Sequence, residues 1–238
     1  MKTNYLLIPF VLFAVLLASC NSGAKVGALR TESRSVELGG ASSVTVNINM
    51  GAGDLKVSGG AEKLLQANFT YNVDKLNPQV KYVDSRLLIQ QPADHGLQLQ
   101  GISDFRNEWD LHFNNDVPMN LKVNMGAGTS NLQLAGLSLT GFDLILGAGN
   151  STVDLNNKWT HDMDITIDTG ATDLSLRLPK DVGVRVKVES GPHTIDAPDL
   201  KQDGNIYTND AYGISNVTLD IDLHSGIGLI HLQLVDAQ

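Results

Sequence analysis

The sequence has little cysteine, few aromatic residues and little positive charge. Its 238 residues include one cysteine, so no disulfide can form within the chain. Aromatic residues make up 5%, and 17 Lys and Arg stand against 26 Asp and Glu, a formal net charge of −9. Such an acidic chain is a poor partner for nucleic acid, because that binding depends on neutralising phosphates. It is equally unsuited to a polybasic contact with anionic lipids.

Common catalytic signatures are absent as well. The chain contains no G-x-S-x-G, H-E-x-x-H or C-x-x-C motif, and its histidines are scattered. A pair of carboxylates for glycoside hydrolysis could still be assembled by the fold, because their spacing is spatial. We therefore expect no enzyme and no cofactor, and a carbohydrate-active enzyme stays open as one alternative.

Apolar residues, at 42%, are abundant, and an uncharged run of them lies near the N-terminus. The stretch from Tyr5 to Ala18 follows Lys2, which is the pattern of a secretory signal peptide. It is short for a membrane span. It ends in Leu17-Ala18-Ser19-Cys20, which resembles the cleavage box of bacterial lipoproteins. The resemblance implies that residues 1–19 are a lipoprotein signal peptide and are removed.

In lipoproteins of that kind the cysteine then carries the lipid, so Cys20 is the expected lipid attachment site. Several acyl chains hold a protein firmly, whereas a single chain binds reversibly. Residues 20–34 are small and polar without a period, which predicts a flexible tether behind the lipid. We expect an exported, membrane-anchored lipoprotein on the periplasmic or extracellular face.

Alternating apolar runs end one residue before a glycine at six places. The first is the run VTVNINM at 44–50, before Gly51. Strict alternation is typical of a half-buried β-strand. A second short alternating run, such as LQL at 132–134, follows most of these glycines. The leading glycines are Gly51, Gly126, Gly147, Gly170, Gly191 and Gly226, and four are followed two residues later by Gly53, Gly128, Gly149 and Gly228.

The units recur with a period of about 22 residues from Gly126 to Gly191, and a longer step leads to Gly226. Two strands per unit at this period predict stacked rungs. The expected fold class is all-β, a β-solenoid-like stack of two-strand rungs joined by Gly-x-Gly turns. Residues 119–238 form the repeated rungs with an insertion at 196–213, and residues 35–118 form a less regular N-terminal β cap.

The Gly-x-Gly pairs allow three interpretations. A phosphate loop needs G-x-G-x-x-G at the start of a helix, and here the third glycine and the helix are missing. Calcium-binding repeats of the G-G-x-G-x-D type recur about every nine residues, much more closely than these units. We expect instead that the glycines are structural and supply positive φ in turns between rung strands.

Asp220, Asp222 and His224 alternate before the last leading glycine, so their side chains would share one face. Carboxylates and imidazole can hold a metal. The rung register, however, places the basic segment 185–189 between this rung and an acidic rung at 164–168. Opposite charges paired across strands contribute roughly 0.2–1 kcal/mol each. We therefore expect a ladder of ion pairs and no metal, with these three residues as the weaker metal candidates.

The insertion 196–213 is a candidate binding loop, because long loops on a rigid stack often carry function. Its alternative role is a cap that shields the edge of the last rungs from aggregation. Trp109 and Phe113 lie on one face of a strand and are expected in the core. The candidate binding residues of the loop are Tyr207, Asp210 and Tyr212.

The pattern resembles the toast-rack family of bacterial envelope proteins over about residues 36–236. The segments that carry the resemblance are NMGAGDLKVSGGA at 49–61, WDLHFNNDVPMNLKVNMGAGTSNLQLAGL at 109–137, LGAGNSTVDL at 146–155 and SGIGLIHLQL at 225–234. This family is related to the C-terminal region of LiaF-type cell-wall-active antibiotic response proteins and to proposed auto-transporter adhesin head domains. LiaF-type members carry N-terminal membrane spans, where this chain has only the lipoprotein cleavage box.

These features together predict a lipid-anchored, non-enzymatic binding or scaffold module of the cell envelope, with an adhesin-like character. Its expected partners are the membrane, through the lipid on Cys20, and an envelope protein or glycan, with no nucleic acid. The first alternative is a sensor or regulator of cell-envelope stress, which the family resemblance alone implies. The second is the carbohydrate-active enzyme.

Overall fold

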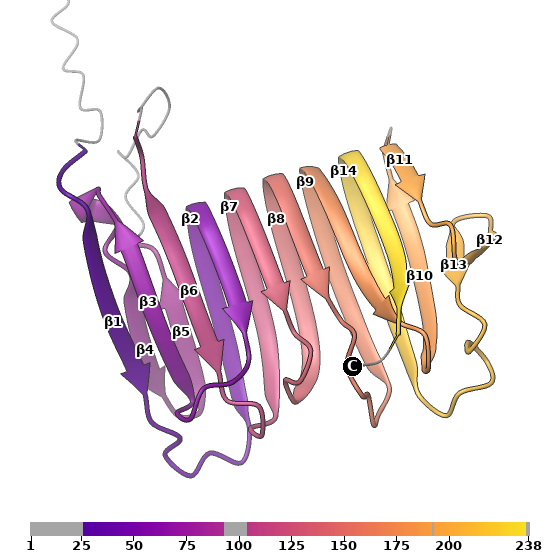
Figure 1. Ribbon diagram of the computed structural model, residues 1–238, viewed down its shortest axis with the longest axis horizontal. Helices are drawn as coiled ribbons and strands as arrows, with labels where there is room; N and C mark the ends of the chain where they lie inside the picture. Colours follow the sequence, from indigo (N-terminus) through magenta and orange to yellow (C-terminus); the bar gives the residue numbers. More distant parts are fainter. Residues whose placement is uncertain (1–25, 93–103, 192, 237–238) are drawn as a thin grey trace, which may run out of the picture.

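Long parallel strands that fold over midway make up most of the computed structural model (Figure 1). The structure describes residues 26–92, 104–191 and 193–236. The predicted signal peptide 1–19 and Cys20 lie outside these residues. Within them the one helix is a short 3-10 turn, Asp74–Leu76. The all-β prediction is confirmed.

Each rung of the stack is a long strand folded over at its glycine. The two strands predicted for a rung are therefore one continuous strand, in which we call the part before the leading glycine the first arm and the part after it the second arm. The sixth rung is split at Gly191 into β10 (Gly183–Ser190) and β11 (His193–Asp196). The five continuous rungs are β2 (Val44–Ser58), β7 (Met119–Gln133), β8 (Leu139–Asp154), β9 (Met163–Pro179) and β14 (Thr218–Val235).

Neighbouring rungs pair in parallel and in register, so alternate side chains of both arms meet in one core. The pairing of β2 with β7 runs from Val44 opposite Met119 to Val57 opposite Leu132. Inward residues along the arms are almost completely buried. The remaining side chains cover two broad outer surfaces, which we call the first-arm face and the second-arm face. The predicted stack of rungs is confirmed.

The N-terminal strands continue both sides of the stack beyond β2. On the second-arm side lie β6 (Asn107–Phe113), β3 (Leu65–Tyr71) and β1 (Arg30–Val36), in that order outward from β2. On the first-arm side lie β5 (Arg86–Gln90) and then β4 (Gln79–Val83). Because β2 pairs with β7 along its length, the structure has no break between the regions 35–118 and 119–238.

β1 corrects the predicted extent of the tether. Residues 30–34, which we assigned to the flexible segment 20–34, belong to this strand and pair antiparallel with β3. The alternation was hidden because β1 is an edge strand whose partly buried positions include the polar residues Glu32 and Arg34. Arg34 donates a hydrogen bond to Glu32 at 2.8 Å and another to Asn77 at 2.6 Å.

The order of the last rungs differs from the chain order. β14 lies between β9 and β10, and it pairs in parallel with both (Figure 1). The prediction that the basic segment 185–189 separates two acidic rungs is therefore wrong. The register was predicted correctly, since Asp220 lies opposite both Asp164 and Arg185. The alternating pattern fixes which residues face each other, but several rungs share that pattern and it does not specify which are neighbours.

The glycines divide into two kinds. The second glycines have positive φ, for example +133° at Gly149, as predicted for the Gly-x-Gly segments. The leading glycines do not, and the prediction of positive φ at these positions is wrong. A Cβ on Gly147 would instead lie 2.1 Å from the carbonyl oxygen of Gly126, so close stacking of the backbones excludes a side chain.

Candidate functional site

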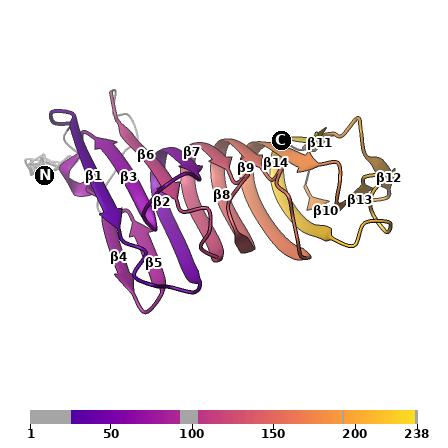
Figure 2. The same cartoon turned by 60° about the horizontal axis from the view of Figure 1, so that its bottom comes forward.

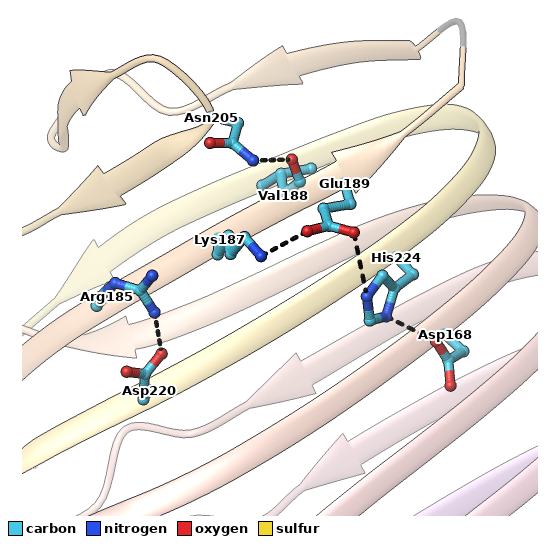
Figure 3. Close-up of polar contacts among 8 residues, drawn as sticks. All are labelled: Asp168, Arg185, Lys187, Val188, Glu189, Asn205, Asp220 and His224. Atoms are coloured by element: carbon cyan, nitrogen blue, oxygen red, sulfur yellow. Dashed lines mark hydrogen bonds and ion pairs between the residues drawn. The ribbon is translucent and has the colours of Figure 1, made fainter.

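The predicted ladder of charges lies on the first-arm face, across β9, β14 and β10. Figure 3 shows Arg185 pointing to Asp220, and Glu189 lying between Lys187 and His224. The Arg185 and Asp220 side chains are 2.5 Å apart, and the Lys187 ammonium is 2.5 Å from the Glu189 carboxylate. That hydrogen bond lowers the pKa of Glu189 and raises the pKa of Lys187. Charges on this surface therefore compensate one another.

His224 bridges two carboxylates of neighbouring rungs. Its Nδ1 lies 2.9 Å from Oδ1 of Asp168, and its Nε2 lies 3.7 Å from Oε2 of Glu189. About half of the His224 side chain is exposed to solvent. The imidazole thus links β9 to β10 across β14 and has both ring nitrogens directed at protein carboxylates.

The three weaker metal candidates are placed on one face, as predicted, but two of them already have partners. Asp220 is paired with Arg185, and His224 is held by Asp168 and Glu189. In the described part of the chain, no group of three or more His, Cys, Asp or Glu residues is arranged to hold a metal. The geometry of Asp220, Asp222 and His224 thus gives no support to a metal centre.

The candidate loop residues are not brought into one site. Within 196–213, the short strands β12 (Lys201–Asp203) and β13 (Ile206–Thr208) form a hairpin, and β13 pairs with the outer edge of β10 (Figure 2). Tyr207 is 7% exposed and joins the core, where burial raises the pKa of its hydroxyl. Asp210 pairs with Lys201 at 2.7 Å on the surface, and Tyr212 is 42% exposed. The loop therefore covers the outer edge of β10, at the end of the stack.

Asn209 is a structural residue of this loop that the sequence did not single out. Its side chain is buried, accepts a hydrogen bond from the Val184 amide at 2.9 Å and donates to the Val182 carbonyl at 2.7 Å. These bonds fasten the end of β13 to the start of β10. A buried Asn with matched donors and acceptors fixes the loop rather than presenting it to a ligand.

Trp109 and Phe113 are core residues, as predicted. Both are almost completely buried, and the Trp109 ring packs edge-on against Phe69 with 5.5 Å between centroids. The indole Nε1 donates to Asn107 at 3.0 Å. Neither ring is available as a binding platform.

The second-arm face carries a hollow that sequence reasoning missed. Its volume is about 490 Å³, and it spans β3, β6, β2 and β7. No local motif predicts this hollow, because its residues come from four strands that are separated in the chain. The lining residues are Asp54, Lys56, Asn68, Thr70, Glu108, Trp109, Asp110 and Thr129.

This hollow combines acidic, basic, amide and hydroxyl groups. Asp54 accepts a hydrogen bond from Thr129, and Asp110 lies 3.2 Å from His112. Lys56 lies opposite Asp110 in the pairing of β2 with β6, but it forms no ion pair with any residue that the structure describes. The site therefore offers hydrogen-bond donors and acceptors of several kinds to a polar ligand.

A second hollow of about 320 Å³ continues the first along β7, β8, β9 and β14. The two share Thr129, so they adjoin on the second-arm face. Beneath the second hollow, the buried hydroxyls of Ser130 and Ser151 are hydrogen-bonded at 2.7 Å. The lining also includes the exposed residues Asn150, Asp173 and Leu229 and the half-buried residues Thr152, Ser175 and His231.

Comparison with known families gives a match over most of the chain. Residues 25–177 match the family model of the N-terminal domain of toast_rack, DUF2154. No curated protein matches the chain. In the described residues, no helix is both long and apolar enough to cross a membrane.

Among solved structures, a candidate cell adhesion protein from Clostridium sporogenes ATCC 15579 has the same fold. It is 29% identical, with a TM-score of 0.84, and the match covers 87% of this chain and 100% of that one. A candidate adhesin from Parabacteroides distasonis ATCC 8503 matches at 14% identity over 90% of this chain and 79% of its own, with a TM-score of 0.35.

Proposed function

Because the chain belongs to the toast-rack family, we propose that it is an exported, lipid-anchored binding module of the bacterial cell envelope, without catalytic activity. The observation that carries this proposal is the likeness to the whole length of the Clostridium sporogenes candidate cell adhesion protein. That protein's described role in cell adhesion becomes part of the proposal for this chain.

The architecture suits a module that displays a surface. The five continuous rungs are paired on both sides along the stack, so neighbouring strands hold the outer side chains at fixed spacing. On the first-arm face, ion pairs compensate many of the charges, and hollows of about 580 and 500 Å³ lie beside the leading glycines. On the second-arm face, the hollow of about 490 Å³ presents acidic, basic, amide and hydroxyl groups. A rigid surface loses little conformational entropy when a ligand binds, which favours affinity.

Anchoring is tested by replacing the proposed lipid attachment site. Cys20→Ala should release the protein from the membrane fraction into the soluble extract, because no acyl chain can then be attached. Ser22→Ala, two residues away, is the matched control and should stay in the membrane fraction. Fractionation followed by intact mass measurement decides the matter. The anchor would be overturned if the Cys20→Ala chain stays in the membrane fraction and its mass differs from that of the wild type only by the substitution itself.

Binding is tested in a separate experiment. The wild-type chain and the soluble Cys20→Ala chain are incubated with intact envelopes from cells that lack the protein. Association of the soluble form with these envelopes is the expected result, since the binding surface does not include the lipid. A soluble form that remains entirely in the supernatant would refute the binding module.

A further inference from the structure

We propose that the second-arm face binds an extended, uncharged, polyhydroxylated chain, a neutral glycan, lying across the rungs. The inference rests on the proposed binding function and names the class of its ligand. Its starting point is the pair of adjoining hollows on this face, which extend from β3 to β14. A continuous depression perpendicular to the strands fits a polymer better than a compact small molecule.

Polar side chains repeat along this depression in register. Asn131, Thr152 and Ser175 occupy matching positions on β7, β8 and β9, one rung apart. Thr152 and Ser175 line the second hollow, and Asn131 lies in the sheet between Thr152 and Lys56, which lines the first hollow. Hydrogen-bonded strands are about 4.8 Å apart, so the row presents an amide or hydroxyl at regular steps. None of the three side chains forms a hydrogen bond within the described part of the chain. Their donors and acceptors are open to a ligand whose hydroxyl groups also recur.

The charges on and around the second-arm face favour a neutral polymer over a polyanionic one. The side chains of Asn131, Thr152 and Ser175 are uncharged, and Lys56 on β2 and His231 on β14 continue the row at its two ends. On the opposite face the outward residues of β7 and β8 include the ion pair of Lys122 with Asp143 at 2.6 Å. The net charge of −9 disfavours polyanionic chains. At one end, Asp54, Glu108 and Asp110 add acceptors that match vicinal hydroxyl groups, and Lys56 adds a donor.

Affinity should depend on chain length. The exposed large apolar residues of the described chain include one aromatic, Tyr212, and it lies in the loop near β10 rather than on this face. Without stacking, each sugar is held by hydrogen bonds alone, and a net hydrogen bond contributes little. Several rungs must then be occupied at once, so that avidity accumulates along the polymer.

The test compares matched double variants on the two faces. Asn131→Ala/Thr152→Val removes one amide and one hydroxyl from the second-arm row. Asn47→Ala/Thr166→Val removes the same two groups from the first-arm face, at outward positions on β2 and β9. The detergent-solubilised full chain and both variants are run by affinity electrophoresis in gels containing dextran, laminarin or galactomannan. Thermal unfolding confirms that each variant is folded.

The expected result is retardation of the wild-type chain by at least one polysaccharide, and no competition by its monosaccharides. The second-arm variant should weaken binding about tenfold or more, and the first-arm variant should leave it unchanged. Equal loss in both variants, or unretarded wild-type protein, would overturn the inference. Wild-type protein that associates with envelopes but is not retarded refutes the glycan alone, while failure to associate with envelopes refutes the proposed function.

Discussion

At the scale of single residues, the leading glycines form a column in which each backbone rests on the next. A Cβ would lie 2.4 Å from the preceding carbonyl at Gly126, 2.1 Å at Gly147 and 2.4 Å at Gly170. Such approaches are far below van der Waals contact, so a side chain there must push two rungs apart. Sequence reasoning identified these positions as structural but assigned them the wrong physical cause.

Gly147→Ala should therefore destabilise the protein although its φ is accessible to alanine. We expect a loss of about 1–3 kcal/mol in the free energy of unfolding, because the methyl group overpacks the stack. Gly204→Ala is the control, since Gly204 has φ +59° but no atom within 4 Å of an added Cβ. Urea titration should rank Gly147→Ala as the more damaging of the two. The reverse order would mean that dihedral strain, not close approach, requires glycine at the rungs.

Two buried threonines on β9 differ in whether their hydroxyls have hydrogen-bond partners. Thr169 donates to Ser225 at 3.0 Å, whereas the Thr172 hydroxyl has no hydrogen-bond partner among the residues that the structure describes. Thr169→Val should cost about 1–2 kcal/mol, because it leaves the Ser225 hydroxyl buried with its bond removed. Thr172→Val should be neutral or stabilising, because it removes an unsatisfied polar group. Similar losses for both substitutions, measured by thermal unfolding, would contradict this assignment.

At the scale of elements, the edge strand β1 is fastened by one acidic side chain. Glu32 accepts hydrogen bonds from the Tyr71 hydroxyl and, at 2.8 Å, from Arg34. These bonds, with Tyr71 the largest cause, lower the pKa of Glu32 below 4.5. Because the folded state binds the proton less readily, the stabilisation is complete above pH 4.5 and is lost as pH falls through the folded pKa.

Glu32→Gln should consequently lower stability at neutral pH and make little difference in acid. The free energy of unfolding of wild type and variant, measured in urea from pH 7 to pH 3, should converge below about pH 4.5. Tyr71→Phe keeps the ring and removes only the hydroxyl, so it should show a smaller gap with the same pH dependence. A gap that is constant across this range would show that Glu32 acts through packing alone.

At the scale of the whole molecule, periodicity predicted the arms, the register and the core, because each depends on local alternation. It did not predict that β14 lies between β9 and β10, since the patterns around Val184 and Leu219 are equivalent. Periodicity also could not predict the second-arm hollow, because Asn68, Glu108 and Thr129 come together only when four strands have paired. Periodicity did not predict β1 either, because its partly buried positions include charged and polar residues whose partners on β3 are remote in the sequence.

The inserted position of β14 makes the C-terminus essential to the interior of the stack. Ending the chain after Ser215 would remove β14, the rung that joins β10 and β11 to β9. We expect this truncation to leave two strand edges unpaired and residues 183–215 detached, with loss of cooperative unfolding and a tendency to aggregate. Deleting residues 26–37, which removes only the edge strand β1, should lower the melting temperature but preserve a single transition. Circular dichroism melts and light scattering compare the two. A monomeric truncation with wild-type melting would mean that β10 pairs directly with β9 when β14 is absent, so that the two rungs are interchangeable neighbours.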